Sequence, residues 1–230
     1  MRRRVEPELL DLLPADDPRA RRSRKDLQRV NAWMGNAKLM AAALRLAFDG
    51  QAPHSIVDLG AGDGAFLLRV ARQLAAGSVT RVLLLDRQDL LQSETRNAFA
   101  ALRCQVQSLQ SELLDWLKQP TKLQFDAMVA NLFLHHFHEA ELAQLLREIA
   151  NRVRVFVAVE PRRSRWSLAF ARMLGLIGCN AVTRHDAVIS VRAGFAGDEL
   201  SRLWPAEGHW SLDERPAGWF SHLFIAARRQ

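Results

Sequence analysis

The chain has 230 residues, of which 49% are hydrophobic, a size and composition typical of one globular domain rather than a disordered chain. Its 32 Lys and Arg against 25 Asp and Glu give a net charge of +7, which raises the question of an acidic partner such as a nucleic acid or a membrane surface. Two cysteines are too few for a disulfide framework and favour a reducing, cytoplasmic compartment. No apolar stretch is long enough to predict a transmembrane helix, and the Met-Arg-Arg-Arg start lacks the apolar core of a secretory signal.

The basic surplus is confined to two segments. Residues 1–29 hold nine basic and six acidic side chains, and residues 152–165 hold five arginines against Glu160. The two signs balance over the rest of the chain, so the net charge describes an N-terminal segment and one later patch. The charge alone therefore does not define the function.

The N-terminal residues are predicted to form an arm followed by helical structure. Three prolines interrupt the first 22 residues, which we expect to be poorly ordered, with regular structure beginning near Ser23. Apolar or small residues then recur three or four positions apart over 27–48, which is typical of one helix face. Gly35 leaves open whether this is one helix or two.

Short apolar runs alternate with helical patterns in the rest of the chain. Strands are predicted at Ser55–Leu59, Thr80–Asp86, Gln105–Leu109, Phe125–Asn131 and Arg154–Glu160, and helices near 65–76, 90–101, 112–118 and 139–152. Such alternation is typical of an α/β fold, a parallel sheet with helices on both faces. We therefore divide the chain into an extension, residues 1–50, and one domain, residues 51–230.

The tail of the chain departs from this alternation. Helical stretches are expected at 166–178 and 197–203, followed by strands over His209–Glu214 and Trp219–Ala227. Only a short turn joins the two strands, so they must form an antiparallel hairpin. The sequence therefore predicts five parallel strands and a terminal hairpin.

The loop after the first predicted strand has the clearest chemical signal. Gly60, Gly62 and Gly64 follow Asp58 at alternating positions and precede a helical stretch, so the backbone can turn tightly and a ligand can approach it. In an open α/β sheet such a loop lies at the carboxyl ends of the strands, where ligands bind. The spacing differs from the G-x-G-x-x-G of dinucleotide-binding loops.

The acids around this loop indicate the charge of its ligand. Asp58 ends the first strand, Asp63 lies in the loop, and Asp86 ends the next strand, where an acid can accept hydrogen bonds from ribose hydroxyls. Carboxylates would repel a pyrophosphate, but they suit a ligand with cationic groups and no phosphate. S-adenosylmethionine, with a sulfonium and an ammonium group, fits this description. An ordinary strand-to-helix turn with incidental acids is the alternative.

These motifs resemble those of class I S-adenosylmethionine-dependent methyltransferases, in particular the branch that methylates quinones and related small molecules. Residues 58–64 are similar to the family's first motif, Asp86 to its second-strand acid, and 125–137 to its fourth strand and following loop. The resemblance covers residues 55–230. It implies a Rossmann-like seven-stranded sheet in the order 3-2-1-4-5-7-6, with S-adenosylmethionine as the cofactor.

The same resemblance implies roles for individual residues. Asp58 and the loop Gly60–Gly64 would hold the methionine part, Asp86 the ribose, and Glu112 with Leu113 the adenine. The full set of expected cofactor-binding residues is Asp58, Gly60, Ala61, Gly62, Gly64, Asp86, Arg87, Glu112, Leu113 and Asn131.

Two histidines are candidates for a general base. His136 lies in the loop after the fourth strand, and His185 stands between Arg184 and Asp186 in a later segment. Imidazole titrates near neutral pH, which suits proton removal from a hydroxyl acceptor. Structural interpretations stay open for both: His136 as a cap of the following helix or packed under the cofactor, and Asp186 as the cap of a short helical turn over 187–191. The histidines at 135, 136 and 138 lack accompanying carboxylates, so no metal site is expected.

The apolar stretch 166–178 also has alternative interpretations. It is either an ordinary packed helix or, with Trp33 and Met34, the roof of a hydrophobic acceptor pocket. A third interpretation is attachment to a membrane surface through this stretch and the basic arm. The electrostatic attraction would be weak, because the arm also contains acidic residues.

Several functions were weighed. The residues favour methyl transfer to a small, fairly hydrophobic acceptor, at oxygen rather than at nitrogen or carbon. A nucleic-acid methyltransferase is the main alternative, but residues 131–134 lack the prolines usual for base amino methylation, and neither Cys104 nor Cys179 has the context of a cytosine nucleophile. A non-catalytic cofactor-binding module is the other alternative. The sequence does not identify the acceptor or the oligomeric state.

Overall fold

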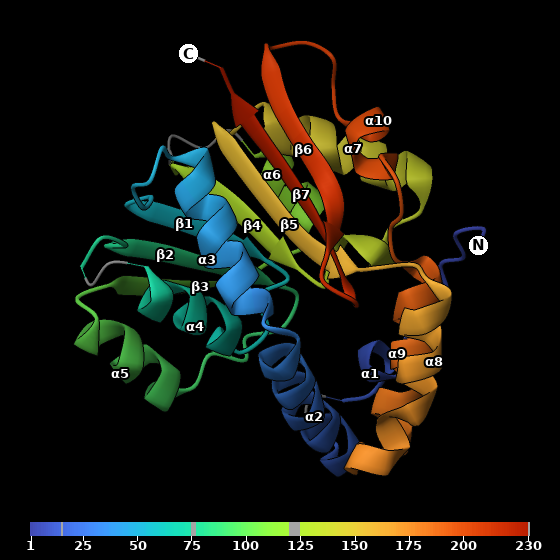
Figure 1. Ribbon diagram of the computed structural model, residues 1–230. Coiled ribbons are helices and arrows are strands. Elements are labelled where there is room, and N and C mark those ends of the chain that lie inside the picture. The colour runs from blue at the N-terminus through green and yellow to red at the C-terminus, as the bar shows by residue number, and fades with distance from the viewer. Residues whose placement is uncertain (15, 75–76, 120–124, 230) are drawn as a thin grey trace.

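The computed structural model describes residues 1–14, 16–74, 77–119 and 125–229. Its centre is a seven-stranded sheet in the order β3-β2-β1-β4-β5-β7-β6 (Figure 1). The parallel strands β1 to β5 are followed by β7, which runs antiparallel to both β5 and β6. The predicted order and the antiparallel hairpin are confirmed. The strands are β1 (Ser55–Leu59), β2 (Arg81–Asp86), β3 (Gln105–Gln110), β4 (Ala127–Asn131), β5 (Val155–Pro161), β6 (Trp210–Ala217) and β7 (Ser221–Arg228).

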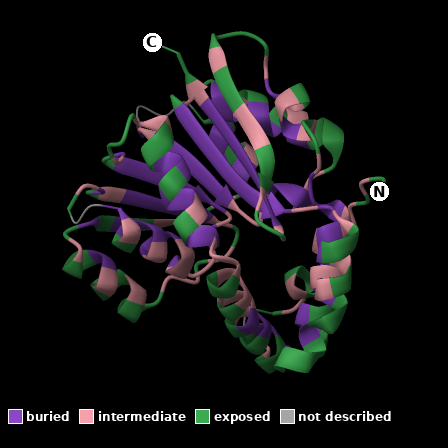
Figure 2. Ribbon diagram, viewed as in Figure 1, coloured by how far each residue is buried: buried purple, intermediate pink, exposed green. Residues whose placement is uncertain are grey.

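Helices cover both faces of the sheet (Figure 1). One face packs against α3 (Asn36–Ala47), α4 (Ala65–Gln73) and α5 (Ser93–Ala101), and the other against α6 (Leu113–Lys118), α7 (Glu139–Ala150) and α10 (Glu199–Leu203). Alternate strand residues face opposite layers, as the pleat requires: Val82 and Leu84 join the first apolar core, whereas Leu83 and Leu85 join the second. The inner strands are accordingly buried through most of their length, whereas the edge strands β3 and β6 are largely half-buried or exposed (Figure 2).

A second group of helices lies at the carboxyl ends of the parallel strands (Figure 1). It consists of α1 (Leu9–Leu12), α2 (Pro18–Met34), α8 (Arg165–Met173), the short helix η2 (Leu174–Ile177) and α9 (Ala181–Ala193). Gly35, in the left-handed conformation, separates α2 from α3, which settles the open question of one helix or two. Within the described residues, no helix combines the length and hydropathy needed to cross a bilayer.

The N-terminal residues are part of the fold, so the prediction of a poorly ordered arm was wrong. Pro18 occupies the first turn of α2, where its missing N–H leaves no hydrogen bond unmade, and Asp17 caps that turn. Further upstream, the Arg3 side chain donates to the carbonyl oxygens of Ala193 and Phe137, at 2.8 and 2.9 Å. Helix α2 therefore begins at a residue that the prediction treated as an interruption.

Helix α9 is the second correction, because only a turn over 187–191 was expected there. The Asn180 side chain caps the helix by accepting from the Thr183 N–H at 2.8 Å. Asp186 is not a cap of α9. Its buried carboxylate instead accepts from the N–H groups of Leu9 and Leu10, at 2.8 and 2.9 Å, and so caps α1. Since α9 packs against α8, α1 and α2, it has no single apolar stripe from which to predict it.

Candidate active site

The glycine loop joins β1 to α4 at the carboxyl edge of the sheet. Gly60 and Ala61 donate their N–H groups to the Leu85 carbonyl oxygen, at 2.9 and 3.1 Å, which fixes the loop to the end of β2. The Gly62 N–H donates to one Asp86 carboxylate oxygen at 2.9 Å, and the Gln88 N–H donates to the other at 3.0 Å. Asp86 is thus held by backbone on both sides, with acceptor lone pairs left over.

The three glycines serve different purposes, although all have positive φ. A Cβ at Gly60 would collide with the Phe133 ring, and one at Gly64 would lie 2.6 Å from the Leu84 side chain. A Cβ at Gly62 would meet no atom within 4 Å. Gly60 and Gly64 are therefore required by packing, whereas Gly62 leaves space on the side of a cavity.

Two adjoining cavities lie beside this loop, with volumes of ≈ 270 and ≈ 560 Å³, a size that suits a small ligand. The first is bounded by Asp58, the glycine loop and α2, and the second by the start of α6 and the loop after β4. The structure thus brings nine of the ten expected cofactor-binding residues to the cavity walls; Gly64 packs beneath them. Those nine are Asp58, Gly60, Ala61, Gly62, Asp86, Arg87, Glu112, Leu113 and Asn131.

Asp58 has the strongest electrostatic signature of these residues. Its side chain is buried, and among the described residues its Oδ2 atom has no hydrogen-bond partner. Burial raises the pKa of this carboxyl well above its usual value, and the nearby Asp86 raises it further. A buried acceptor without a donor is unfavourable unless a ligand supplies one. A cationic or proton-donating ligand group in the cavity therefore fits Asp58.

Replacing Asp86 with alanine is expected to weaken binding of S-adenosylhomocysteine by about 1–3 kcal/mol, because ligand hydroxyls and the Gly62 N–H lose their acceptor. Calorimetry would measure the change. Asp89 is the matched control, since it is exposed and contacts Ser108 instead. Equal affinities of the Asp86→Ala and Asp89→Ala variants would contradict the assignment.

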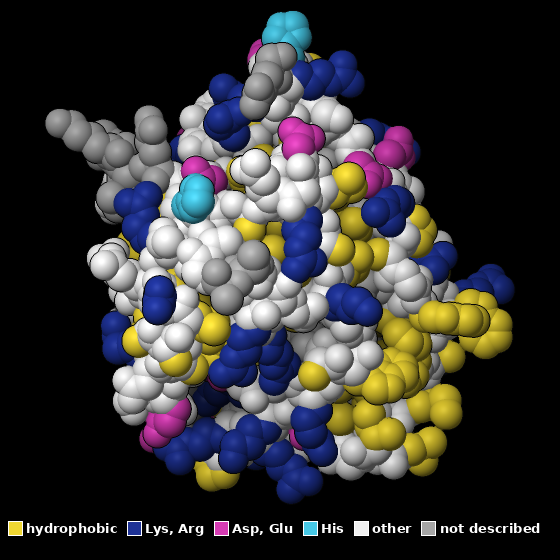
Figure 3. Space-filling model, turned by 60° about the vertical axis from the view of Figure 1, so that its left-hand side comes forward, with side chains coloured by type: hydrophobic (Ala, Val, Ile, Leu, Met, Phe, Trp, Pro, Cys, Tyr) yellow, Lys and Arg dark blue, Asp and Glu magenta, His cyan; other side chains and the backbone are white. Residues whose placement is uncertain are grey.

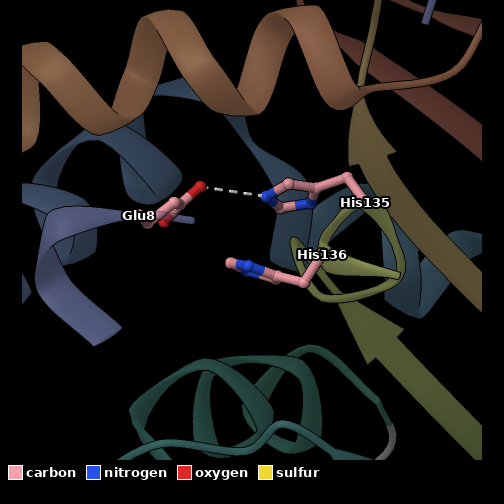
Figure 4. Close-up of side chains that lie close together, drawn as sticks. All are labelled: Glu8, His135 and His136. Carbon is pink, nitrogen blue, oxygen red and sulfur yellow. Dashed lines mark hydrogen bonds and ion pairs between the residues drawn. The ribbon is translucent and has the colours of Figure 1, made fainter. Parts of the chain in front are cut away.

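The loop after β4 is held by a buried carboxylate at the end of β5. Glu160 accepts from the N–H groups of Phe133 and Leu134, at 3.0 and 2.8 Å, at the start of the short helix η1 (Leu134–His136). Its other oxygen lies 2.8 Å from Nδ1 of His135, whose Nε2 lies 3.3 Å from Glu8 (Figure 4). Burial works to lower the pKa of His135, but the two carboxylates outweigh it and raise the pKa to about 9. His135 is thus a buried cation between two acids.

His136 lies beside this ion triad and lines both cavities (Figure 4). Its Nδ1 atom is 3.5 Å from a carboxylate oxygen of Asp11. Burial lowers the pKa of His136, and the positive charge of His135 lowers it further. The imidazole of His136 is therefore neutral at pH 7, the form in which it can accept a proton.

Glu8, His135 and His136 also offer ligand atoms within 4.8 Å of one another, close enough for a metal ion. However, both ring nitrogens of His135 already face carboxylates, and a protonated imidazole is not a metal ligand. A proton on each ring nitrogen of His135 thus accounts for the closeness of these side chains without a metal ion. That no metal binds stays a prediction.

The structure does not bring His185 to the cavities. Its side chain is exposed on α9, with Nδ1 3.0 Å from the buried carboxylate of Asp186. The interpretation of His185 as a base is therefore corrected on geometry. The stretch 166–178 likewise contributes nothing to the described cavity walls; α2 does so instead, through Leu27, Gln28 and Asn31.

Three acids of the site were missed in the sequence. Glu160 ends a buried strand, as Asp58 and Asp86 do, so the signal that identified those two was available for it as well. Glu8 and Asp11 had no signal, since they lie in the segment that was expected to be unstructured. They reach the site because two residues of α9 bind that segment. Asp186 accepts from the first N–H groups of α1, and the Ser190 hydroxyl donates to Glu8.

The stability of the protein is expected to fall as the pH rises from about 6.5 to about 9. The pKa of His135 is raised to about 9 in the folded state from 6.5, so its ion pairs contribute fully below pH 6.5 and are lost as the pH passes 9. The contribution is on the order of 3 kcal/mol. Denaturant unfolding across this range would measure it, and His135→Gln should lack this decline. If the stability of both proteins fell equally over this pH range, His135 would not be a cation paired with Glu8 and Glu160.

The sheet order is that of the class I methyltransferase fold. Residues 56–155, from β1 to the first residue of β5, match a family model described as a methyltransferase domain. That match spans the glycine loop, Asp86 and the histidine loop. Residues 56–155 thus match a methyltransferase domain, and the sheet around them has the fold of class I S-adenosylmethionine-dependent methyltransferases.

Solved structures share this fold at low sequence identity. The plantazolicin methyltransferase BpumL in complex with SAH superposes with a TM-score of 0.65 at 14% identity, over 93% of this chain and 92% of that one. An O-methyltransferase family protein from Burkholderia thailandensis gives 0.60 at 17%, over 93% and 61%, and the mitomycin 7-O-methyltransferase MmcR gives 0.63 at 16%, over 96% and 60%. The chain thus spans about three fifths of the last two. No curated protein matches the sequence.

Proposed function

We propose that the protein transfers the methyl group of S-adenosylmethionine to a hydroxyl of a small, fairly hydrophobic acceptor. The observation that supports this most is the position of His136. A histidine that is neutral at pH 7 borders both cavities, where it can take the proton that an alcohol or phenol loses during methyl transfer. Two of the structural neighbours described above are O-methyltransferases by their descriptions, which agrees with oxygen as the acceptor atom.

The cofactor fits across the two cavities. Asp58 and Gly62 would contact the methionine part in the first, and Glu112 and Leu113 the adenine in the second, with Asp86 at the ribose between them. S-adenosylmethionine supplies an electrophilic methyl group when bound. The protein supplies orientation, which accounts for much of the rate of such a displacement.

Residues 1–50 are proposed to complete the acceptor side of the site. Glu8, Asp11 and the α2 residues Leu27 and Gln28 line the first cavity, and Gln28 bonds Asp63 of the glycine loop at 2.5 Å. Asp11 also lies 3.6 Å from Arg87 at the end of β2. The extension therefore encloses the place where an acceptor must meet the cofactor and excludes water from it.

A screen with methyl-labelled S-adenosylmethionine would test this function. Phenols, quinols and acyl compounds are offered as acceptors, with RNA as a separate arm and S-adenosylhomocysteine binding as a check on the folded site. Methylation of a phenol or quinol, at oxygen as shown by mass spectrometry, is the expected result. Methylation of RNA alone, or at carbon or nitrogen, would overturn the proposal. Tight cofactor binding without any transfer would favour a binding module.

A further inference from the structure

The helices α8 and η2 expose large apolar side chains that the active site does not use. Trp166 and Leu176 are 73% and 78% exposed, and Met173 and Ile177 are also more than half exposed. From α2, Trp33 stacks on Phe170 of α8 with ring centroids 4.9 Å apart. The turn between β6 and β7 adds Trp219, whose carbonyl accepts from Ser167 of α8 at 3.3 Å. We call the exposed members the apolar patch: Trp33, Trp166, Met173, Leu176, Ile177 and Trp219.

This clustering is unusual for a surface in contact with water alone. Scattered exposed apolar residues are normal, but contiguous groups of them mark sites of interaction. The composition is also specific, because it combines long aliphatic side chains with three tryptophans. Tryptophan is enriched at the boundary between water and the hydrocarbon of a bilayer, where one end of the ring is apolar and the other is wet.

A strip of basic side chains borders the apolar patch. Arg21, Arg22, Lys25 and Arg29 are exposed on α2 around a shallow hollow, and we call them the basic strip. The Arg22 guanidinium donates to the carbonyl oxygen of Gly178 at 3.5 Å, directly after Ile177 of the patch. Figure 3 shows basic and apolar side chains gathered beside each other on the lower part of the molecule.

The structure also limits the acidity that weakened a membrane interpretation of the sequence, because few acids lie on this surface. Asp26 is the single acid within α2, and it is buried, with its carboxylate bonded to Arg29 and to the Asn180 N–H. Residues 162–185, which contribute Trp166, Met173, Leu176 and Ile177 to the patch, contain no Asp or Glu. The remaining N-terminal acids precede α2. Of these, Asp16 is exposed and Asp17 pairs with Arg19 at the start of α2, so the surface beside the apolar patch is predominantly basic.

We propose that the apolar patch and the basic strip bind the surface of a membrane that contains anionic lipid. Apolar side chains entering the interface, with Lys and Arg beside them at the level of the head groups, are the combination that such surfaces retain. A nucleic acid would satisfy the basic strip but would offer nothing to Leu176 and Ile177. A second copy of the chain, docked symmetrically, would oppose two strips of the same charge. Charge complementarity thus selects an anionic surface with an apolar interior.

Docking in this way would place the side of α2 that carries the basic strip against the bilayer. The opposite side of the same helix supplies Leu27, Gln28 and Asn31 to the first cavity. A lipophilic compound dissolved in the membrane would therefore have a short route to the site. The binding itself does not depend on which acceptor is used.

Sedimentation of the full chain with lipid vesicles tests the proposal. The expected result is binding to vesicles of equal parts phosphatidylcholine and phosphatidylglycerol, no binding to phosphatidylcholine alone, and weaker binding at high salt. The double variant L176S/I177S should lower vesicle affinity at least about tenfold. Leu46→Ser is the matched control, because Leu46 is 63% exposed on α3, outside the patch. S-adenosylhomocysteine affinity should be the same in all three proteins, which shows that they are folded.

Four outcomes would overturn the proposal. The first is absence of wild-type protein from the anionic vesicle pellet, and the second is equal loss of binding in Leu46→Ser and the double variant. The third is a wild-type dimer that L176S/I177S converts to a monomer, which would assign the patch to a second copy. Competition by RNA that removes the protein from vesicles without any effect of L176S/I177S would assign the basic strip to nucleic acid and overturn it as well.

Discussion

Replacing His136 with glutamine is expected to lower kcat about 10²- to 10⁴-fold while cofactor affinity stays within a few-fold of the wild type. The reason is that His136 borders both cavities, where we propose that acceptor and cofactor meet, and is neutral at pH 7. Its lowered pKa adds a second signature: wild-type kcat should rise with pH through a value below 6.5 and then level off, and the glutamine variant should lose that rise. Steady-state rates between pH 5 and pH 8 would measure both.

His185→Gln is the matched comparison for this experiment. It removes another histidine, but one that is exposed on α9 and outside the cavity walls, so kcat should stay near the wild-type value. If His185→Gln lowered the rate and His136→Gln did not, the assignment of the base would be wrong. If neither variant lowered it, transfer would depend on orientation alone.

Replacing Glu160 with glutamine is expected to lower the free energy of unfolding by about 3–5 kcal/mol. The carboxylate is fully buried, accepts two backbone N–H groups of the loop after β4, and pairs with the His135 cation. A glutamine amide can accept on one side only and presents N–H donors to donors on the other. The variant thus leaves a buried charge without its nearest partner.

Denaturant unfolding at pH 7 would measure this loss. Glu94→Gln is the control, since Glu94 is exposed in the first turn of α5, and such surface changes stay within about 0.5 kcal/mol. Equal stability of the two variants would show that Glu160 is not the anchor of the histidine loop.

The parts of the fold that could be predicted from the sequence are those with a local cause. A strand that is buried on both faces is a short apolar run in the sequence, so the strands of the sheet could be predicted. The tight turn after β1 requires glycine, so the glycine loop could be predicted as well. The acid Asp86 was visible for the same reason, because it ends such a run. The order of the strands came from the resemblance to a known family.

The parts that could not be predicted depend on contacts between distant residues. The α1 cap is an aspartate 177 positions along the chain from Leu9, and no local pattern contains that information. Helix α9 has neighbours on several sides, so it shows no periodic stripe. Adjacency of His185 to Asp186 in the sequence predicts a catalytic pair, but the Asp186 carboxylate caps α1 and His185 lies outside the described cavity walls.

The ion triad and the cap at Asp186 also constrain the order in which the site is completed during synthesis. Glu8 meets His135 across 127 positions, and Leu9 meets Asp186 across 177. Glu8 and Leu9 therefore lack these two partners until synthesis has reached Asp186. The sheet and the glycine loop can form from neighbouring units before then, but the cavity wall that contains Glu8 is completed only afterwards.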